Sequence, residues 1–498
     1  MKFSNPVIPG FHPDPSVCRV GLDFYLVTSS FEYFPGVPIF HSRNLVNWKQ
    51  IGHCLTRKSQ LPLADAAISG GIYAPTIRYH AGRFYMVTTN VSNGGNFYVW
   101  SVDPAGEWSD PIWVDQGGID PDLFWDDDGS VFFTSTSIIQ RKIDIETGKL
   151  LMEPTSLWSG CGGHYPEAPH LYKIEGRYYL IIAEGGTEYG HCVTIARSTS
   201  PQGPWESCPH NPILTHRSKN DLPIQATGHA DMIQDSNGNW WLVCLGIRPK
   251  GYHPCHFLGR ETFLTPVQWV DGWPIVGNDG QIALEMEGFD GLPSVEKQTY
   301  STHDDFEDER LPLHWNFLGN PVEGAWSLAD SQLVLRCAAS NLDVMNGQSW
   351  VGRRQQHFNF RASARLVFTP KAEFEEAGIT VFQNVAHHYA VGLVRQAQDC
   401  RLVVRRTIGT LTAEVASITV PEGAVTLVIE GNETEYSLGY APDDSTPVFL
   451  AKGETRYLST EVGGRFTGVF LAMYATAHGH SSDNTAAFDW FNYDVPGE

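Results

Sequence analysis

A motif that occurs five times in the first three hundred residues constrains the fold of this chain more than any other feature. In each copy, a turn rich in Gly, Asp or Asn precedes a pair of aromatic or apolar residues that opens an apolar strand. The pairs begin at Phe24, Phe84, Val131, Tyr178 and Trp240, at spacings of 60, 47, 47 and 62 residues. A period of about 40–50 residues with about four strands in each unit is typical of a β-propeller blade.

Five such units predict a five-bladed β-propeller over residues 1–295. A β-helix and a string of small sandwiches are the alternatives. Each unit is too long for one β-helix rung, and a closed ring leaves no exposed sheet edge, so the propeller is favoured. Beyond residue 295 the motif stops, and residues 332–336, 361–368, 401–405 and 425–430 alternate between apolar and polar. This period of two predicts an antiparallel β-sandwich over residues 304–498 and an all-β protein.

One polar residue of each unit stands ten or eleven positions before the strand-opening pair. These residues are Asp14, Tyr73, Asp120, Glu167 and His229. If the first strands of the blades line the channel, all five side chains ring its axis at one end. Each one alone is better explained as a polar residue that satisfies a local turn. Five in the same phase, three of them acids, indicate a shared pocket.

Three carboxyl groups around one pocket suit the cleavage of a glycosidic bond. One protonates the leaving oxygen, one activates a water molecule, and a third raises the pKa of the acid by like-charge repulsion. The same cluster could instead bind a divalent cation. Two acidic segments, 126–129 and 235–238, are interpreted as hairpin turns, because neither has a Glu at the twelfth position of a calcium loop.

Charge and cysteine content restrict the partners and the compartment. The chain has 56 acidic and 34 basic residues and a formal charge of −22, which argues against nucleic acid and anionic membranes as partners. No run approaches the roughly 20 apolar residues of a membrane span, and no export signal is recognised. Nine scattered cysteines without a CxxC pair indicate reduced thiols. We therefore expect a cytoplasmic protein with a carbohydrate substrate, and we expect it to form a homo-oligomer.

The segments around the three acids resemble glycoside hydrolase family 43. Residues 5–16 resemble the motif of that family that carries the general base, which implies this role for Asp14. Residues 118–121 resemble the motif of the pKa-modulating aspartate, and residues 166–173 resemble that of the general acid. The resemblance thus implies that Asp120 modulates, that Glu167 is the acid, and that hydrolysis inverts the anomeric configuration.

The resemblance extends to the branch of β-xylosidases and α-L-arabinofuranosidases. Residues 29–48, 183–187, 228–230 and 258–263 match it in order. It implies that Phe31, Thr187 and Arg260 line the sugar pocket and that His229 lies on the channel axis. Some resembling enzymes depend on a metal and others do not, so either a Ca²⁺ ion, bound mostly through water, or a cluster of water molecules alone is expected near His229. The branch also has a concanavalin-like sandwich that leans over the mouth of the propeller, which residues 304–306, 313–317 and 488–493 resemble.

Two departures from this branch bear on sugar preference. Many members have Trp at the positions of Tyr73, which we count among the substrate-binding residues, and of Ile138. We expect exo-acting release of xylose from the non-reducing ends of β-1,4-xylo-oligosaccharides, with arabinofuranosidase side activity. The alternatives are an enzyme that is primarily an α-L-arabinofuranosidase and a non-catalytic carbohydrate-binding protein. A fructan-active enzyme is disfavoured, because residues 12–15 read His-Pro-Asp-Pro and lack the expected Asn-Asp-Pro motif.

Overall fold

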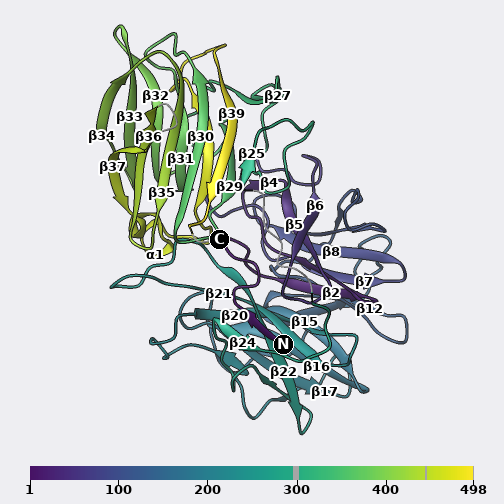
Figure 1. The fold of residues 1–498 in the computed structure, drawn as a ribbon. Coiled ribbons are helices and arrows are strands. Elements are labelled where there is room, and N and C mark those ends of the chain that lie inside the picture. Colours follow the sequence, from purple (N-terminus) through teal and green to yellow (C-terminus); the bar gives the residue numbers. More distant parts are fainter. Residues whose placement is uncertain (295–301, 443–445, 497–498) are drawn as a thin grey trace.

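The computed structural model describes residues 1–294, 302–442 and 446–496, and nearly all of its regular structure is β-sheet (Figure 1). Five antiparallel sheets, four of them four-stranded and one five-stranded, follow one another along the first part of the chain, and the predicted propeller is confirmed. The blades consist of β2 (Ser16–Val20), β3 (Asp23–Val27), β5 (Gly36–Ser42) and β6 (Lys49–Leu55); β7 (Thr76–His80), β8 (Arg83–Asn90), β9 (Gly95–Ser101) and β10 (Ile112–Trp113); β11 (Asp122–Trp125), β12 (Val131–Ser135), β13 (Ile139–Lys142) and β14 (Thr155–Ser156); β15 (Glu167–Ile174), β16 (Arg177–Glu184), β17 (Cys192–Ser198) and β18 (Glu206–Ser207), with β19 (Leu214–Thr215) beside β17; and β20 (Gln225–Gln234), β21 (Trp240–Ile247), β22 (Glu261–Val270) and β23 (Trp273–Val276).

The repeated sequence motif corresponds to the first hairpin of each blade. Its aromatic or apolar pair lies on the second strand, and the turn before it contains a glycine with a positive φ angle. A tight turn between twisted strands requires this conformation, which glycine adopts without steric cost. The glycines are Gly21 (64°), Gly82 (86°), Gly129 (82°), Gly176 (79°) and Gly238 (87°).

The ends of the propeller sequence close the ring. Strand β1 (Lys2–Ser4) pairs with β24 (Glu285–Glu287), beyond the last blade. The side chain of Asn5 exchanges two hydrogen bonds with the backbone of Leu264 on β22, each 2.9 Å long. Blade 5 is therefore joined to the segment that enters blade 1.

A buried guanidinium group links all five blades inside the channel. Arg78 of blade 2 forms ion pairs with Asp122 of blade 3 at 3.0 Å and with Asp231 of blade 5 at 2.8 Å. Asp231 also accepts hydrogen bonds from the hydroxyl groups of Ser16 in blade 1 and Tyr172 in blade 4. Because both carboxylates are almost fully buried, the cation is needed to offset the cost of their burial.

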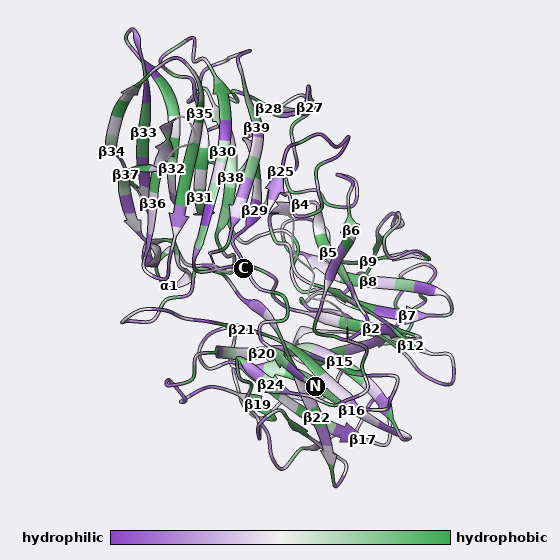
Figure 2. Ribbon diagram, viewed as in Figure 1, coloured by the Kyte–Doolittle hydropathy of each residue, from purple (hydrophilic) through white to green (hydrophobic). Residues whose placement is uncertain are grey.

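The rest of the chain forms the predicted sandwich. Its larger sheet has the order β27 (Trp326–Ala329), β28 (Gln332–Arg336), β39 (Thr485–Asp494), β30 (Phe360–Phe368), β35 (Gly423–Gly431), β36 (Glu435–Ala441) and β37 (Val448–Glu454), with β25 (His303–Asp304) beside β39. The smaller has the order β29 (Ser349–Arg354), β38 (Phe470–Thr476), β31 (Glu376–Asn384), β32 (His387–Gln396), β33 (Asp399–Ile408) and β34 (Leu411–Val420). Apolar residues alternate along these strands (Figure 2) and meet in one core between the sheets.

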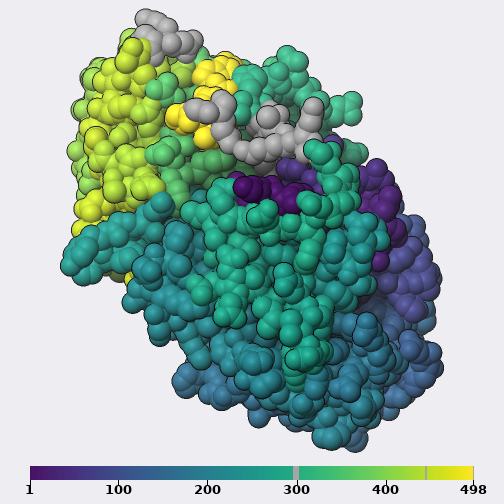
Figure 3. All heavy atoms as spheres, turned by 60° about the horizontal axis from the view of Figure 1, so that its bottom comes forward, coloured from purple at the N-terminus to yellow at the C-terminus, as the bar shows by residue number. Residues whose placement is uncertain are grey.

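The two parts of the chain are packed directly against each other (Figure 3). Strand β26 (Phe317–Leu318) pairs with β4 (Tyr33–Phe34) of the propeller. The rings of Tyr33 and Phe470 stack at 4.0 Å, and the buried guanidinium of Arg354 donates to the backbone oxygen of Phe11 at 2.7 Å. Residues 295–301, between the two predicted domains, lie outside the described residues, so the predicted boundaries at 295 and 304 stay predictions.

Within the described residues, the helices are short: η1 (Thr136–Ile138), η3 (Thr455–Leu458) and α1 (Thr460–Gly463). Within the described ranges, no helix has the length and apolarity that crossing a membrane requires.

Replacing Arg78 by Ala should destabilise the propeller. The change leaves two buried carboxylates without their cation, and breaking a buried pair in this way costs about 3–5 kcal/mol. The free energy of unfolding, measured by urea denaturation, checks this. Arg83→Ala on the same blade is the control, because its pair with Glu146 is solvent-exposed and such pairs contribute about 0–1 kcal/mol. Equal effects of the two changes would contradict the role of Arg78.

Candidate active site

The five residues in equal sequence phase lie at equivalent places in their blades. Asp14 and Asp120 stand two residues before the first strands of blades 1 and 3, and Tyr73 stands three before that of blade 2. Glu167 is the first residue of β15, and His229 lies within β20. All five therefore approach the channel from the same end of the propeller.

Irregular backbone directs these side chains. Asp14, Asp120 and His229 have φ angles of 57°, 53° and 48°, and Ala168, directly after Glu167, has 50°. The pairing register also shifts between Glu167 and His170 and on both sides of Gly228. A β-bulge turns a side chain away from the direction that regular pleating gives it, and such strained positions concentrate at functional sites.

Asp14 is held ionised by two hydrogen-bond donors. The Arg260 guanidinium donates from Nη1 to Oδ1 at 2.8 Å, and Ser29 Oγ donates to Oδ2 at 2.5 Å. Burial alone would raise the pKa of Asp14, but the charge of Arg260 and the Ser29 hydroxyl outweigh it, so the pKa of this carboxyl lies below its usual range. His229 Nδ1 is 3.7 Å from Oδ1. Burial lowers the pKa of His229 to about 4, so Arg260 is the cation beside Asp14 near neutral pH.

Glu167 and Asp120 have the opposite electrostatic character. Burial and the negative charge of Asp14 raise the pKa of Glu167 to about 7. Burial, followed by the charges of Glu167 and Asp14, raises the pKa of Asp120 well above its usual range. Below about pH 7 Glu167 thus holds a proton, whereas Asp14 is a carboxylate. Two carboxyl groups whose surroundings push their pKa values apart are suited to act as a base and an acid.

The predicted substrate-binding residues surround the Arg260 guanidinium. Its Nη1 also donates to Thr187 Oγ1 at 3.0 Å, and its central carbon lies 5.6 Å from the centre of the Phe31 ring. The ring of Tyr73 is 5.2 Å from that of Phe31. Arg260, Phe31, Thr187 and Tyr73 therefore lie in one continuous set of contacts that includes Asp14.

The sequence analysis missed Phe466, which comes from the sandwich. Its ring lies 5.5 Å from the Arg260 guanidinium and 5.9 Å from Phe31. Its backbone N–H donates to Ser69 Oγ at 3.0 Å, which fixes this loop to the propeller. Nothing in the propeller repeat could identify a residue some two hundred positions beyond Arg260. The contact places one sandwich residue at the site, as the predicted leaning of that part over the mouth requires.

Ile138 contributes no surface to the site. Its side chain is fully buried and belongs to an apolar cluster with Leu171, Leu180 and Ile182. The residue therefore offers no face on which a second sugar could stack, in agreement with the expectation from its type.

Among the described residues, Asp120, Glu167 and His229 form a group that could hold a metal ion, because each has one ligand atom within 4.8 Å of the others. Calcium takes six to eight oxygen ligands, and an imidazole is a poor ligand for it. The group offers two carboxyl groups with raised pKa values, and the charge of Arg260 acts on both of them. The set does not fit directly bound calcium.

Water-mediated binding of calcium at His229 stays a prediction. Activity lost on chelation and restored by calcium alone would support it, and unchanged activity would exclude it.

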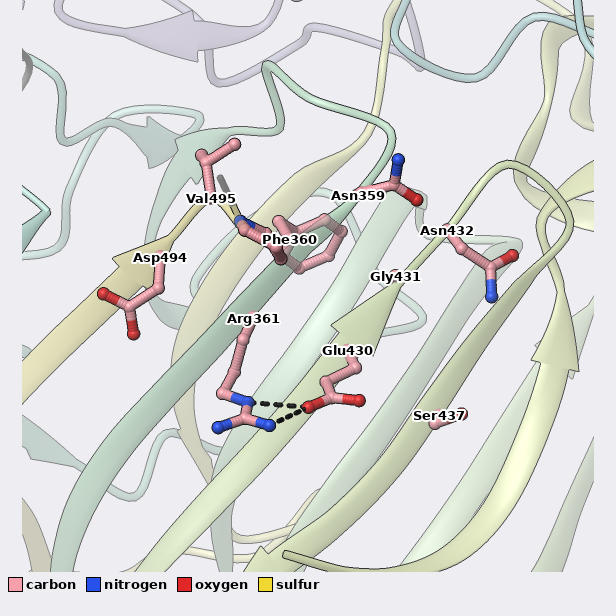
Figure 4. Close-up of a pocket in the computed structure, with 10 residues that line it drawn as sticks. Asn359, Phe360, Arg361, Glu430, Gly431, Asn432, Ser437, Asp494 and Val495 are labelled. Atoms are coloured by element: carbon pink, nitrogen blue, oxygen red, sulfur yellow. Dashed lines mark hydrogen bonds and ion pairs between the residues drawn. The ribbon is translucent and has the colours of Figure 1, made fainter. Parts of the chain in front are cut away.

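A separate cavity of about 630 Å³ lies on the outer side of the sandwich (Figure 4). Its charged residues Arg361 and Glu430 form an ion pair with each other across β30 and β35. None of the three acids lines it. This cavity therefore takes no part in the site described above.

Comparisons with known proteins agree with this geometry. Residues 3–274 match the family described as "Glycosyl hydrolases family 43", and residues 303–494 match the "Beta xylosidase C-terminal Concanavalin A-like domain". The "Non-reducing end alpha-L-arabinofuranosidase BoGH43B" of Bacteroides ovatus is 44% identical, with 99% of this chain and 94% of the relative covered. The "Beta-xylosidase" of Bacillus subtilis is 33% identical, with 99% of each chain covered.

Solved structures show the same overall similarity. The structure described as "Bacteroides ovatus Xyloglucan PUL GH43B" superposes with a TM-score of 0.96 at 44% identity, covering 99% of this chain and 100% of that one. "GH43 BlXynB protein from Bacillus licheniformis" superposes with a TM-score of 0.95 at 35% identity, with the same coverage. The likeness thus extends over both parts of the chain.

Replacing Arg260 by Ala should move both limbs of the pH profile of kcat/KM to higher pH. Removing the cation raises the pKa of Asp14, which must be ionised, and that of Glu167, which must be protonated. In the unchanged protein, activity should fall above about pH 7, where Glu167 loses its proton. Arg260→Lys is the control: it keeps the charge and loses the planar fork, so its rate should fall with little movement of either limb. If both limbs of the kcat/KM profile of Arg260→Ala fall at the same pH as in the unchanged protein, Arg260 does not set the pKa values of Asp14 and Glu167.

Replacing Phe466 by Ala should raise KM for a pentoside more than it lowers kcat, because the ring forms a wall of the pocket and lies outside the group of acids. Truncation of a packed aromatic anchor in a binding site costs about 1–4 kcal/mol, so we expect at least about a fivefold rise. Phe449→Ala on β37 of the same sandwich is the control, since that ring is 36% exposed and none of the ring contacts of the site includes it. A KM that does not change would show that the sandwich does not contribute to the pocket.

Proposed function

The chain belongs to glycosyl hydrolase family 43 and is a glycoside hydrolase, and from this premise we propose that it removes single pentose units from the non-reducing ends of oligosaccharides with inversion. The observation that carries the proposal is the unequal pairing of the three acids. Arg260 forms an ion pair with Asp14 at 2.8 Å, and in the described residues Glu167 and Asp120 have no such partner. The pKa of Asp14 is accordingly lowered, and the pKa values of Glu167 and Asp120 are raised. A non-catalytic binding protein would have no use for this arrangement, and none of its relatives named above is such a protein.

The reaction uses the acids in two distinct roles. Asp14 takes a proton from a water molecule, whose oxygen attacks the anomeric carbon. Glu167 gives its proton to the glycosidic oxygen as the bond between that oxygen and the anomeric carbon breaks. The sugar leaves with the opposite anomeric configuration, and a second proton exchange with water restores both groups. In inverting enzymes the two carboxyl groups lie about 6.5–9.5 Å apart, which leaves room for the water.

Arg260 and Asp120 support this division of labour. The guanidinium stabilises the ionised form of Asp14 and also contacts Thr187, so its remaining donors can bind sugar hydroxyl groups through a planar fork. Asp120 has a carboxyl oxygen within 4.8 Å of one of Glu167, where a negative charge on it would raise the pKa of the acid by like-charge repulsion. Asp120 thus modulates the pKa of Glu167 and helps to position it.

Exo action follows from closure of the pocket. Phe466 reaches the site from the sandwich, and the pairing of β26 with β4 holds the two parts together. A pocket walled on this side admits a chain end more readily than the middle of a polymer. A ladder of products from long xylan would contradict exo action.

We propose that arabinofuranosides are hydrolysed at least as well as xylosides. Tyr73 gives the pocket a smaller aromatic wall than Trp would, and Ile138 is buried and gives a leaving xylose nothing to stack on. In addition, the relative at 44% identity is named an arabinofuranosidase, and another, of Butyrivibrio fibrisolvens at 40%, is named "Xylosidase/arabinosidase". Xylosidase activity as the main reaction is the second candidate, supported by the name of the Bacillus subtilis relative. A homo-oligomeric state and a cytoplasmic location stay predictions.

Turnover of nitrophenyl α-L-arabinofuranoside, β-D-xyloside and β-D-glucoside tests the function. We expect hydrolysis of both pentosides and little of the glucoside, because the closed pocket would have to accommodate the additional hydroxymethyl group of glucose.

Asp14→Asn and Glu167→Gln should each lower kcat by at least about 10²–10⁴-fold, as expected for a lost general base or acid. Proton NMR of xylobiose hydrolysis should show α-xylose first. A first-formed β-anomer, or efficient cleavage of the glucoside, would overturn the proposal.

A further inference from the structure

A second cavity lies at the end of the propeller opposite the three acids. It has a volume of about 570 Å³ and is formed by blades 4 and 5. The acids stand at the beginning of the first strands, whereas this cavity is bordered by the turns that follow those strands, near Glu175, Gly238 and Asp271. Strand β15 separates the two ends, and eight residues of strand span about 26 Å at about 3.3 Å per residue. We call it the blade 4–5 cavity.

Aromatic rings form one wall of the blade 4–5 cavity. Trp269 lies between Tyr179 and Trp240, with ring centres 5.0 Å and 5.8 Å away and both pairs inclined at 72°. Tyr179 is fixed by a hydrogen bond from its hydroxyl group to the backbone oxygen of Gly272, 3.0 Å long. The two indole rings are half-buried and keep part of their surface open. The wall is therefore rigid and offers apolar surface without a rotamer to be ordered on binding.

The rim of the blade 4–5 cavity carries both signs of charge. Glu175, Arg177 and Asp271 are exposed there, and in the described residues the side chains of Glu175 and Arg177 form no ion pair. Arg197 also lines the cavity, so two cations and two carboxylates lie in close proximity, and they create no strong field for an ion of either sign. They do provide planar donors and acceptors for a neutral molecule that has an apolar face and many hydroxyl groups.

From these features we propose that the blade 4–5 cavity is a second carbohydrate-binding site, which holds a neutral segment of a pentose-containing polysaccharide. The C–H face of a sugar ring lies against the indoles, and its hydroxyl groups bind Arg177 and the two carboxylates. The choice of polysaccharide rests on the proposed function. Binding here keeps the enzyme on a polymer while the pocket at the other end trims chain ends, and it raises the effective concentration of those ends.

Retention on insoluble arabinoxylan tests this proposal in the full chain with Glu167→Gln, which cannot degrade the polymer. Saturating xylose and arabinose fill the pocket, so any remaining affinity comes from elsewhere. Trp240→Ala and Arg177→Ala should each weaken retention at least about fivefold, the minimum expected for loss of a binding anchor. Arg177 is exposed, so its replacement tests the site without disturbing the packing. Tyr79→Ala, 39% exposed at the turn end of blade 2, is the matched control and should be retained like the parent.

The outcomes separate the two proposals. In the active background, Trp240→Ala and Arg177→Ala should hydrolyse nitrophenyl pentosides at the parental rate. Failure of the parent to bind arabinoxylan, or equal retention of all variants, would overturn the second site even if pentosides are hydrolysed. Absence of pentoside hydrolysis in the parent would instead overturn the proposed function.

Discussion

The ion pair between Arg260 and Asp14 is the interaction on which the site depends. It gives three neighbouring carboxyl groups different pKa values, because only Asp14, which contacts the guanidinium, has a lowered pKa. Its negative charge then helps to keep the proton on Glu167. Without the cation, burial would favour the neutral form of all three groups, and the site would have an acid without a base. Arg260 also contacts Thr187, Phe31 and Phe466. The same guanidinium therefore contacts both the general base and the side chains proposed to bind the sugar.

The propeller makes this arrangement possible by bringing distant segments to one axis. Asp14 and Arg260 are 246 positions apart, and they meet because blade 5 closes beside blade 1. Arg78 fixes the blades deeper in the channel through its pairs with Asp122 and Asp231. The sandwich then adds Phe466 from outside the ring. The site is thus built in layers, with a rigid channel below, the acids at its end and an aromatic wall supplied by the second part of the chain.

Much of this arrangement could be predicted from the sequence because a propeller is a repeat. Equal phase in the repeat means equal place in the ring, so counting from Phe24 or Trp240 locates Asp14 and His229 at one end of the channel. Loops and tertiary contacts follow no such rule. Phe466 lies in a loop after α1, and no period relates it to Arg260. The ion pairs of Arg78 were not predicted either. Arg78 stands five positions after Tyr73, whereas Asp122 stands only two after Asp120. Because the first strands begin at different offsets, the repeat does not show that these two side chains meet.

Direct titration of the side-chain carboxyl groups tests most sharply whether Asp14 is ionised while Glu167 still holds its proton. Carbon-13 NMR of protein labelled at the Asp and Glu carboxyl carbons, with Glu167→Gln and Asp14→Asn used for assignment, reports each protonation state over pH 3 to 9. We expect the Glu167 carboxyl to titrate near pH 7. We expect the Asp14 carboxyl to titrate below the pH at which an aspartate usually does, because its pKa is lowered. A Glu167 carboxyl that titrates near its ordinary value of about 4.3, or an Asp14 that is protonated at pH 6, would contradict it.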